Sequence, residues 1–438
     1  MRRIFLLASA VAFLVAGFGS ALAFTGPLLP KASSPEKVGL SSERLARIDR
    51  VIGKEIADKR LPGAVILIAR KGKLAYTYVS GLQDPVKGTP MTGDSMFRIF
   101  SMTKPMVTVA ALSLMEEGAI ELTDPVSKFL PALKKMQVSV AQRDAATGAV
   151  TYKLVPADRE ITIHDLLRHT SGLTYGERTS NPLVREEYAT HKLALAPFAI
   201  TREQFVDGLS KSPLMAHPAT TFEYGLSADL MGAVIEVVTG KRLATVLAER
   251  IWKPMKMTDT AFWVRPEKQN RLANAFATDP SDGSKTNLEG LDAPFNEPAF
   301  DSGGAGSLST AGDYIRFSQM LLNGGTLEGV RILSRSSVQL MTADHMDPRI
   351  TNPLAASEAG LGTLGYSFGL GFGVRTATGM TGIPGSVGEF MWAGAGGTYF
   401  WVDPKEQLVT VYMTQRPGPS RGYYRKLIKQ LVHQAIAD

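Results

Sequence analysis

The sequence predicts a mixed α/β domain together with a mainly helical domain, the second inserted into the first. Runs rich in β-branched and aromatic residues occur near the amino terminus and again near the carboxyl terminus of the 438-residue chain. Between them, apolar residues recur at the spacing of amphipathic helices, with long polar loops in between. We therefore expect an antiparallel sheet built from both chain ends and flanked by terminal helices.

The amino-terminal elements follow a lead-in that is rich in Pro, Gly and Ser. Residues 24–40 form this lead-in and are expected to be extended. Ser41 can cap the helix that comes next, in which apolar residues recur every three or four positions as far as Ile56. The β-rich runs 64–70 and 73–80 flank a Lys-Gly pair, which predicts a hairpin.

The rest of the chain changes from helices to strands. Helices are expected over residues 101–117, 161–169, 202–210, 227–251 and 309–323. Strands are expected over residues 366–374, 389–392, 398–402 and 408–414, before a closing helix over 424–435. We accordingly assign residues 41–96 and 325–438 to the α/β domain and residues 97–324 to the helical domain.

The first 23 residues have the layout of a secretory signal peptide. Arg2 and Arg3 form a short positive head, a mostly apolar run follows, and Ala21-Leu22-Ala23 offers a small-x-small cleavage site. An uncleaved membrane anchor is the alternative, but the apolar run is short for a membrane span. We expect an exported protein, periplasmic or secreted, with no stable membrane span once residues 1–23 are removed.

Composition excludes several classes of protein. The chain has no cysteine, which rules out disulfides, cysteine nucleophiles and thiolate metal sites. Its formal net charge of +7 is spread along the chain without a run of like charges, so nucleic-acid binding gets no support. No glycine-rich loop joins a clear strand to a helix, and the six histidines lack metal-ligand spacing. We expect no cofactor and no bound metal.

The strongest chemical signal is Ser101-Met102-Thr103-Lys104. Residues i and i+3 share one face of a helix, about 5–6 Å apart at Cβ, so a helix that starts here brings hydroxyl and amine together. The helix amino terminus favours negative charge on the attacking oxygen, and a partly desolvated lysine can accept the serine proton. A capping serine beside a solvated lysine is the alternative interpretation, because such tetrads are common. We predict Ser101 as the nucleophile and Lys104 as its base.

Several blocks around this tetrad resemble the β-lactamase-related serine hydrolases. They are residues 97–104, 112–118, 122–126 and 163–173, the last of which reads Ile-His-Asp-Leu-Leu-Arg-His-Thr-Ser-Gly-Leu. The resemblance covers most of the chain, from about residue 34 to residue 436. It implies the fold of β-lactamases and DD-peptidases, with the active site at the junction of the two domains.

The family's second motif holds a tyrosine that is often followed two residues later by asparagine. Tyr224 matches the tyrosine by position, and the resemblance implies that its hydroxyl carries a proton between the nucleophile, Lys104 and the leaving group. A core tyrosine with a locally bonded hydroxyl is the alternative. Leu226 stands where asparagine is expected, which is a departure from the pattern.

The third motif is usually Lys-Thr-Gly or His-Thr-Gly on a strand. Trp392-Ala393-Gly394 stands in its place and resembles the W-x-G form of family VIII carboxylesterases. Gly394 is expected to let substrate lie against the strand, where a side chain would block it. By the family pattern, the backbone N–H groups of Ser101 and Ala395 form the oxyanion hole.

These departures bear on the substrate, a small-molecule ester or amide. A β-lactam carries a carboxylate that a cation in the third motif helps to hold, and Trp392 has no positive charge. Leu226 replaces an amide that contacts a β-lactam side chain. Both apolar residues are predicted substrate contacts, and they favour uncharged esters cleaved through a Ser101 acyl-enzyme. The alternatives are a β-lactamase, D-aminopeptidase, DD-peptidase or other amide hydrolase on the same site, or a non-catalytic binding protein of this fold.

A second serine lies in a competing motif. Residues 365–369 read Gly-Tyr-Ser-Phe-Gly and match the G-x-S-x-G nucleophile elbow, which requires a strand, a sharp turn and a helix. The residues that follow read as continuing strand, and His433 is the only downstream histidine that offers a base. We therefore expect Ser101 rather than Ser367 to be the nucleophile.

Overall fold

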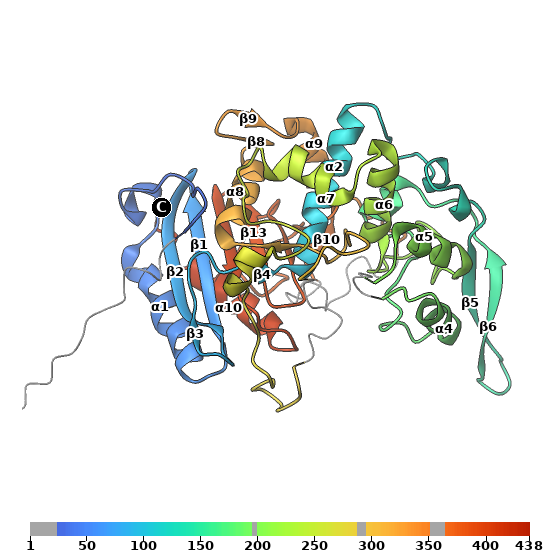
Figure 1. Cartoon of the computed structure of the whole chain (residues 1–438), viewed down its shortest axis with the longest axis horizontal. Helices are drawn as coiled ribbons and strands as arrows, with labels where there is room; N and C mark the ends of the chain where they lie inside the picture. The colour runs from blue at the N-terminus through green and yellow to red at the C-terminus, as the bar shows by residue number, and fades with distance from the viewer. Residues whose placement is uncertain (1–23, 195–198, 287–294, 351–363) are drawn as a thin grey trace, which may run out of the picture.

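The computed structural model describes residues 24–194, 199–286, 295–350 and 364–438. The predicted signal peptide lies outside these residues. Figure 1 shows blue and red strands side by side in one part of the molecule and green helices in the other. Within the described residues, no helix combines the length and apolar character that crossing a membrane requires.

Both ends of the chain contribute to one 8-stranded sheet, which confirms the predicted fold class. Its order is β10 (Tyr366–Phe368), β11 (Gly373–Arg375), β12 (Phe390–Ala393), β13 (Tyr399–Asp403), β14 (Leu408–Met413), β1 (Gly63–Arg70), β2 (Lys73–Asp84) and β3 (Thr89–Pro90). Neighbouring strands are antiparallel, and β1 joins the two chain ends because it pairs with both β14 and β2. All residues of β1 are buried, which fits its apolar sequence.

Helices cover both faces of this sheet. They are α1 (Ser42–Ala57), α8 (Ala311–Leu322) and α10 (Arg421–His433). On β13, the ring centre of Phe400 lies 4.9 Å from that of Tyr314 on α8, whereas Trp401 stacks on His433 of α10 at 6.1 Å. Adjacent residues of a strand point to opposite faces, so α8 and α10 lie on opposite sides of the sheet. α1 packs beside α10.

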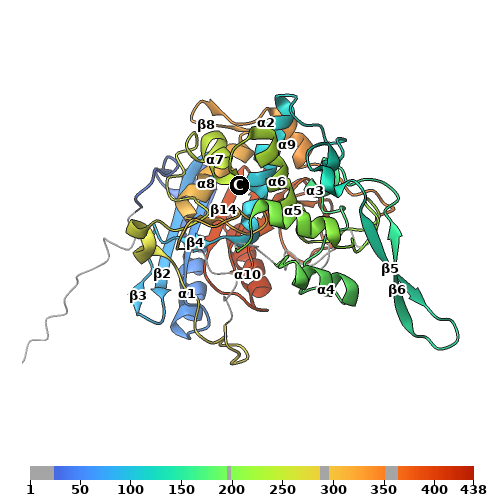
Figure 2. The same cartoon turned by 45° about the vertical axis from the view of Figure 1, so that its right-hand side comes forward.

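The middle of the chain surrounds α2 (Thr103–Glu116), which is buried continuously from Thr103 to Leu114 and packs on α6 and α7. The other helices are α3 (Ile163–Leu167), α4 (Pro182–Thr190), α5 (Arg202–Lys211), α6 (Ser227–Thr239), α7 (Leu243–Leu247) and α9 (Arg335–Met341). Short strands pair as β4 (Phe97–Arg98) with β7 (Leu308–Ser309), β5 (Gln137–Arg143) with β6 (Val150–Pro156), and β8 (Thr326–Leu327) with β9 (Val330–Arg331). Figure 2 shows the β5–β6 hairpin projecting from the helices.

Several elements differ from those expected. The single strand expected over residues 366–374 is wrong: Gly371, with a φ of +77°, lies between β10 and β11, which form a hairpin. The helix expected over residues 227–251 is interrupted at Gly240, whose φ of +66° ends α6. The sequence pattern did not predict α4 or the β5–β6 hairpin. Helix α8 falls within the segment assigned to the helical domain but packs against β1, β13 and β14, and the domain boundaries stay an interpretation.

A pair of histidines ties the helical part to the sheet edge. His164 of α3 and His345 lie 2.9 Å apart, Nε2 to Nδ1, and the amide of His345 donates to Phe368 of β10 at 2.9 Å. The Nε2–H of His345 donates to the Leu340 carbonyl at 2.7 Å, so its Nδ1 accepts from His164. Burial, followed by the charge of Arg168, lowers the pKa of His164 to about 4. The hydrogen bond therefore requires a neutral His345, whose pKa burial also lowers, and burial disfavours the charged form of His164.

We expect the pair to make stability depend on pH. A histidine held neutral in the folded state contributes stability fully above its unfolded pKa of 6.5, and this contribution is lost as pH falls from 6.5 towards 4. The free energy of unfolding should fall over that range, and His164→Gln should make the fall shallower. Urea unfolding at a series of pH values measures this. Equal slopes in the two proteins would contradict it.

Candidate active site

Ser101 lies in the short 3-10 turn η2 (Phe100–Met102), directly before α2. Phe100 has a φ of +44°, a left-handed backbone conformation that is strained for a residue with a side chain. The Thr103 hydroxyl holds the turn, since it donates to the Phe100 carbonyl at 2.6 Å and accepts the Ser307 amide at 3.1 Å. Ser101 is partly exposed, whereas Phe100 and Met102 are buried. The turn thus presents the serine and buries its neighbours.

Lys104 lies one helical turn further on and is 1% exposed. Its Nζ is 3.2 Å from Ser101 Oγ, 3.2 Å from the Tyr175 hydroxyl and 2.7 Å from the Gly304 carbonyl oxygen. An ammonium group has three donors, and these three oxygens are placed to accept one each. The structure therefore brings Ser101 and Lys104 together in a site that keeps the amine away from bulk water.

Tyr175 is a site residue that the sequence analysis does not identify. It lies in the loop between α3 and α4, is 1% exposed, and its ring centre is 5.8 Å from that of Tyr224. The one available signal is its position two residues after Leu173, where the recognised block ends. Because its hydroxyl contacts Lys104, two tyrosines border the lysine.

Tyr224 lies before α6 and reaches the same lysine. Lys104 Nζ lies over its ring, 4.6 Å from the ring centre, which is a cation–π distance. The indole N–H of Trp392 donates to the Tyr224 hydroxyl at 3.2 Å, and the His169 ring packs 4.7 Å from the Tyr224 ring, centre to centre. The structure places the Tyr224 ring beside Lys104. The role of its hydroxyl in proton transfer stays a prediction.

Trp392 and Leu226, the predicted substrate contacts, are both buried. Trp392 is 1% exposed and its one polar atom is bonded to Tyr224, so in this structure it holds that tyrosine in place. Leu226 is 0% exposed and belongs to the hydrophobic core beside the start of α6. Contact of either side chain with substrate stays a prediction.

The end of β12 brings Gly394 and Ala395 against the turn that carries Ser101. A Cβ atom at Gly394 would lie 2.4 Å from the Ile99 carbonyl oxygen and 2.3 Å from Thr398 Oγ1. The close approach of two chain segments is one reason for glycine at this position. Contact of substrate with the strand at Gly394 stays a prediction. Ala395 is partly exposed, as Ser101 is. Their joint role as an oxyanion hole stays a prediction.

A buried carboxylate fixes the carbonyl group that Lys104 contacts. Asp229 of α6 is 0% exposed and accepts the Gly304 amide at 3.1 Å and the Ser302 hydroxyl. Burial raises the pKa of Asp229, while the positive charge of Lys104 acts in the opposite direction. Asp229 therefore orients the turn around the lysine. The sequence analysis does not identify it, because the contact joins residues 75 positions apart.

The competing serine has a different setting. Ser367 lies in β10, which is followed by strand β11 rather than by a helix. Its hydroxyl donates to a carboxylate oxygen of Asp344. His433, the base that the elbow would need, lies on α10 and stacks on Trp401. Residues 365–369 therefore lack the strand–turn–helix geometry of a nucleophile elbow.

Two carboxylates and a histidine gather elsewhere in the α/β part. Ligand atoms of Glu389, Asp403 and His433 lie within 4.8 Å of one another. Lys429 Nζ lies 2.8 Å from the Glu389 carboxylate, and an Arg375 nitrogen lies 3.4 Å from it. These two cations balance the two carboxylates, so the group is a buried ion-pair network. The expectation of no bound metal stays a prediction.

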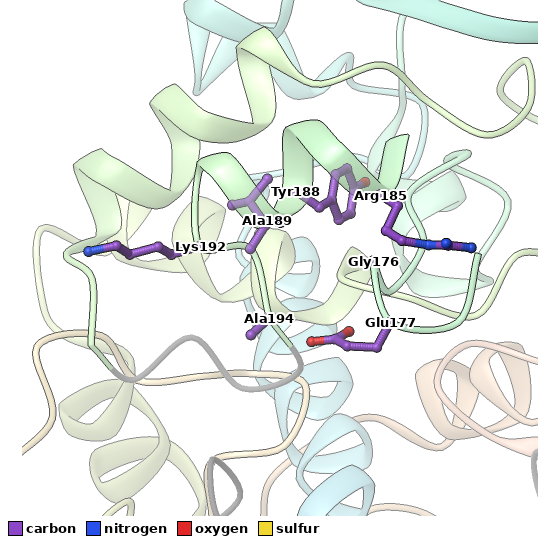
Figure 3. Close-up of a pocket in the computed structure, with 8 residues that line it drawn as sticks. Gly176, Glu177, Arg185, Tyr188, Ala189, Lys192 and Ala194 are labelled. Atoms are coloured by element: carbon purple, nitrogen blue, oxygen red, sulfur yellow. The ribbon is translucent and has the colours of Figure 1, made fainter. Parts of the chain in front are cut away.

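A surface cavity of 360 Å³ lies beside the loop that carries Tyr175. Its lining residues are Gly176, Glu177, Arg185, Tyr188, Ala189, Lys192, Leu193 and Ala194. Figure 3 shows the Lys192 and Arg185 side chains extending to opposite sides, with Ala189 and Tyr188 between them. The volume is at the lower end of the range for small-molecule pockets. The cavity can therefore hold a small, largely apolar group.

Known proteins are similar to this chain in sequence and in fold. The beta-lactamase family model matches residues 48–433. Protein Rv1367c of Mycobacterium tuberculosis is 36% identical over 369 residues, which cover 83% of this chain and 88% of that protein. Esterase EstB of Burkholderia gladioli is 28% identical over 394 residues, which cover 84% and 90%. The solved structure of EstCE1, a hydrolase with promiscuous acyltransferase activity, matches with a TM-score of 0.72 and 27% identity, covering 89% of this chain and 99% of that chain.

These matches confirm the resemblance stated from the sequence motifs. The matched segment runs from α1 into α10 and contains Ser101, Lys104, Tyr224 and Trp392. A family model that spans most of the chain, a relative 36% identical over 83% of it and a structural neighbour that is a hydrolase agree with one another. The chain therefore belongs to the beta-lactamase family and is a serine hydrolase.

Proposed function

We propose that this protein is an exported esterase that cleaves carboxylic esters through an acyl-enzyme on Ser101. The observation that carries the proposal is the 3.2 Å contact between Ser101 Oγ and Lys104 Nζ, made by a lysine that is 1% exposed. The likeness to an esterase and to a hydrolase supports ester chemistry. Export rests on the sequence of residues 1–23 alone.

Acylation starts when Lys104 has lost one proton, so that its two remaining N–H groups can donate to Tyr175 and Gly304 and its lone pair faces Ser101 Oγ. Its lone pair takes the Ser101 proton as Oγ attacks the ester carbonyl carbon, and the carbonyl π electrons move onto the carbonyl oxygen. The backbone N–H groups of Ser101 and Ala395 bind this oxyanion. When the tetrahedral species collapses, the bond to the alcohol oxygen breaks. Tyr224 passes a proton to that oxygen and regains one from Lys104.

Deacylation repeats these transfers with water. The water proton moves to the Tyr224–Lys104 pair as the water oxygen attacks the acyl carbon, and Ser101 regains a proton when the acid departs. Tyr175 and the Gly304 carbonyl oxygen hold Lys104 from the other side, at 3.2 Å and 2.7 Å. Their contacts keep Nζ directed at Ser101 through both halves of the reaction.

Uncharged esters suit this site better than β-lactams. Trp392 stands where a cation would hold a β-lactam carboxylate, and its indole is bonded to Tyr224. One observation favours the alternatives, such as a β-lactamase, because a positive charge can hold a substrate carboxylate. The Arg178 guanidinium lies 6.0 Å from the centre of the Tyr224 ring and brings such a charge to the site.

Parallel assays separate these substrate classes. The assays compare the mature protein, its Ser101→Ala variant and a buffer blank on p-nitrophenyl butyrate and on nitrocefin. Ester turnover that Ser101→Ala abolishes, with slow or absent nitrocefin cleavage, is the expected result. Nitrocefin turnover far above ester turnover would overturn the esterase assignment and favour a β-lactamase.

Culture fractionation of the full-length chain tests export, with the protein expected in the periplasm or the medium.

Acyl transfer to an alcohol is a second candidate activity. EstCE1, which shares 27% identity and a TM-score of 0.72, is a hydrolase with promiscuous acyltransferase activity. An alcohol that replaces water in deacylation needs no change in the residues of the mechanism above. With vinyl butyrate and 1-butanol in water, this activity gives butyl butyrate, which gas chromatography detects. Formation of butyric acid alone would exclude it.

Removing the indole N–H tests how Tyr224 is held. Trp392→Phe keeps an aromatic side chain but removes the indole donor to the Tyr224 hydroxyl, a contact worth about 1–2 kcal/mol. We therefore expect kcat for p-nitrophenyl butyrate to fall about 5- to 30-fold, with KM nearly unchanged. Trp401→Phe, an indole of the neighbouring strand that faces α10, is the matched control and should keep kcat. A change confined to KM would instead favour a substrate contact for Trp392.

A further inference from the structure

We propose that Arg425 strengthens the oxyanion hole by binding the opposite end of the peptide unit that supplies its second N–H group. The proposal rests on the proposed function and deepens it, because it names a positioning residue for the same reaction. Arg425 lies on α10, outside all three motifs of the sequence analysis. It is expected to act on the transition state of acylation without touching the substrate.

Arg425 is a buried cation directed at one backbone carbonyl. Its side chain is 1% exposed, and its Nη2–H donates to the carbonyl oxygen of Gly394. The C=O of Gly394 and the N–H of Ala395 belong to the same planar peptide unit. The Gly397 amide also donates to this carbonyl, at 3.0 Å. Arg425 therefore adds a charged donor to a carbonyl whose direction also sets that of the Ala395 N–H.

The same peptide unit lies against the nucleophile turn. A Cβ atom at Gly394 would be 2.4 Å from the Ile99 carbonyl oxygen, and one at Gly396 would be 2.7 Å from the Phe100 ring. Ala395 lies between these two contact points and is partly exposed, as is Ser101, which follows Phe100. The peptide unit that Arg425 contacts therefore lies next to the turn that carries Ser101.

The effect on the reaction is electrostatic. A hydrogen bond accepted by a peptide C=O polarises the peptide and makes its N–H a better donor, by about 10–30% per bond. A guanidinium donor is charged, and its field also favours negative charge on the oxygen that forms when Ser101 Oγ bonds to the carbonyl carbon. Burial lowers the pKa of Arg425 to about 9, so it still carries its charge at neutral pH.

A second arginine on the same helix provides a matched comparison. Arg421, one turn before Arg425, donates to the Ala395 carbonyl oxygen at 3.3 Å. That carbonyl belongs to the next peptide unit, whose N–H is that of Gly396. Loss of Arg421 therefore removes a neighbouring positive charge and a similar contact while leaving the Gly394–Ala395 peptide bound.

The test compares Arg425→Met, Arg425→Lys and Arg421→Met with the wild type in the mature enzyme. Kinetics with p-nitrophenyl butyrate give kcat and KM, and inhibition by butylboronic acid reports affinity for a tetrahedral anion on Ser101. We expect Arg425→Met to lower kcat about 10- to 100-fold with KM within about twofold, and to weaken boronate binding by a similar factor. Arg425→Lys should recover part of both losses, and Arg421→Met should change each less than about threefold.

Binding of butyramide, a neutral ground-state analogue, separates this role from a general structural one. Its affinity should be the same in all four proteins. Equal loss of butyramide and boronate binding, or equal effects of Arg421→Met and Arg425→Met, would overturn the proposal. If Arg425→Met does not fold, Arg425→Lys and Arg425→Gln decide the same comparison. If the wild type turns over ester through Ser101 and the Arg425 variants keep its kcat, this proposal alone is rejected. If the wild type shows no ester turnover that depends on Ser101, the proposed function is rejected.

Discussion

Replacing Lys104 by methionine is expected to lower kcat/KM for p-nitrophenyl butyrate by about 10²- to 10⁴-fold. Methionine has a similar length but no amine, so Ser101 loses the atom that lies 3.2 Å from its Oγ and accepts its proton. The lysine is 1% exposed, so bulk water does not reach its position to accept the proton in its place. Steady-state kinetics at several pH values measure the effect and show whether the pH profile also changes.

An exposed lysine supplies the control for this substitution. Lys128 is paired with Asp124 at 2.8 Å and its side chain is 51% exposed, so Lys128→Met should leave kcat/KM unchanged. Thermal unfolding of both variants distinguishes lost chemistry from lost folding. A Lys104→Met enzyme within tenfold of wild type, alongside an inactive Ser101→Ala, would contradict lysine as the base and move the role to Tyr175 or Tyr224.

Replacing Glu389 by alanine is expected to reduce the free energy of unfolding by about 3–5 kcal/mol. Glu389 is 0% exposed and accepts from Lys429, also 0% exposed, at 2.8 Å; Arg375, 2% exposed, lies 3.4 Å away. Removal of the carboxylate leaves two buried cations without this partner. Burial already lowers the pKa of Lys429, and the charge of Glu389 opposes that shift.

Urea unfolding at neutral pH measures this loss against an exposed ion pair. Asp207 and Lys211 lie 2.7 Å apart with side chains 59% and 56% exposed, so Asp207→Ala should cost less than about 1 kcal/mol. A Glu389→Ala loss equally small would mean that Lys429 is neutral in the variant. It would also mean that the network around Asp403 and His433 contributes little to stability.

Local spacing explains which site residues could be predicted from the sequence. Ser101 and Lys104 are three positions apart at a helix start, so helix geometry alone brings them together. Tyr175 and Asp229 act through contacts that join distant segments, such as the hydrogen bond between Lys104 and Tyr175, 71 positions apart. No short pattern reports such a contact.

The sequence motifs single out further residues but do not show what holds them in place. Gly394 is small because a Cβ atom would meet the Ile99 carbonyl oxygen at 2.4 Å, a fact that depends on how β12 packs against η2. Trp392 occupies the third motif as expected, yet its indole N–H is bonded to Tyr224 and the ring is buried. Side-chain direction and burial follow from tertiary packing, which the residue type at one position does not determine.

Apolar runs in the sequence predict the central strands of the sheet. The prediction of a strand is wrong where a glycine changes the direction of the chain. Strands β1 and β14 have mostly apolar sequences and are buried throughout. The segment after Tyr366 also reads as strand, but Gly371 takes a positive φ and divides it into two short strands. Glycine adopts either conformation at little cost, so its turn is set by the packing around it.

Mapping of a covalent adduct tests the central claim most directly. Mature protein is treated with an ethoxy fluorophosphonate, digested and analysed by mass spectrometry, next to Ser101→Ala and Ser367→Ala variants treated in the same way. We predict one adduct on the peptide that contains Ser101, unchanged labelling of Ser367→Ala and no labelling of Ser101→Ala. Labelling that persists in Ser101→Ala, or an adduct mapped to another serine, would contradict the assignment of Ser101 as the nucleophile.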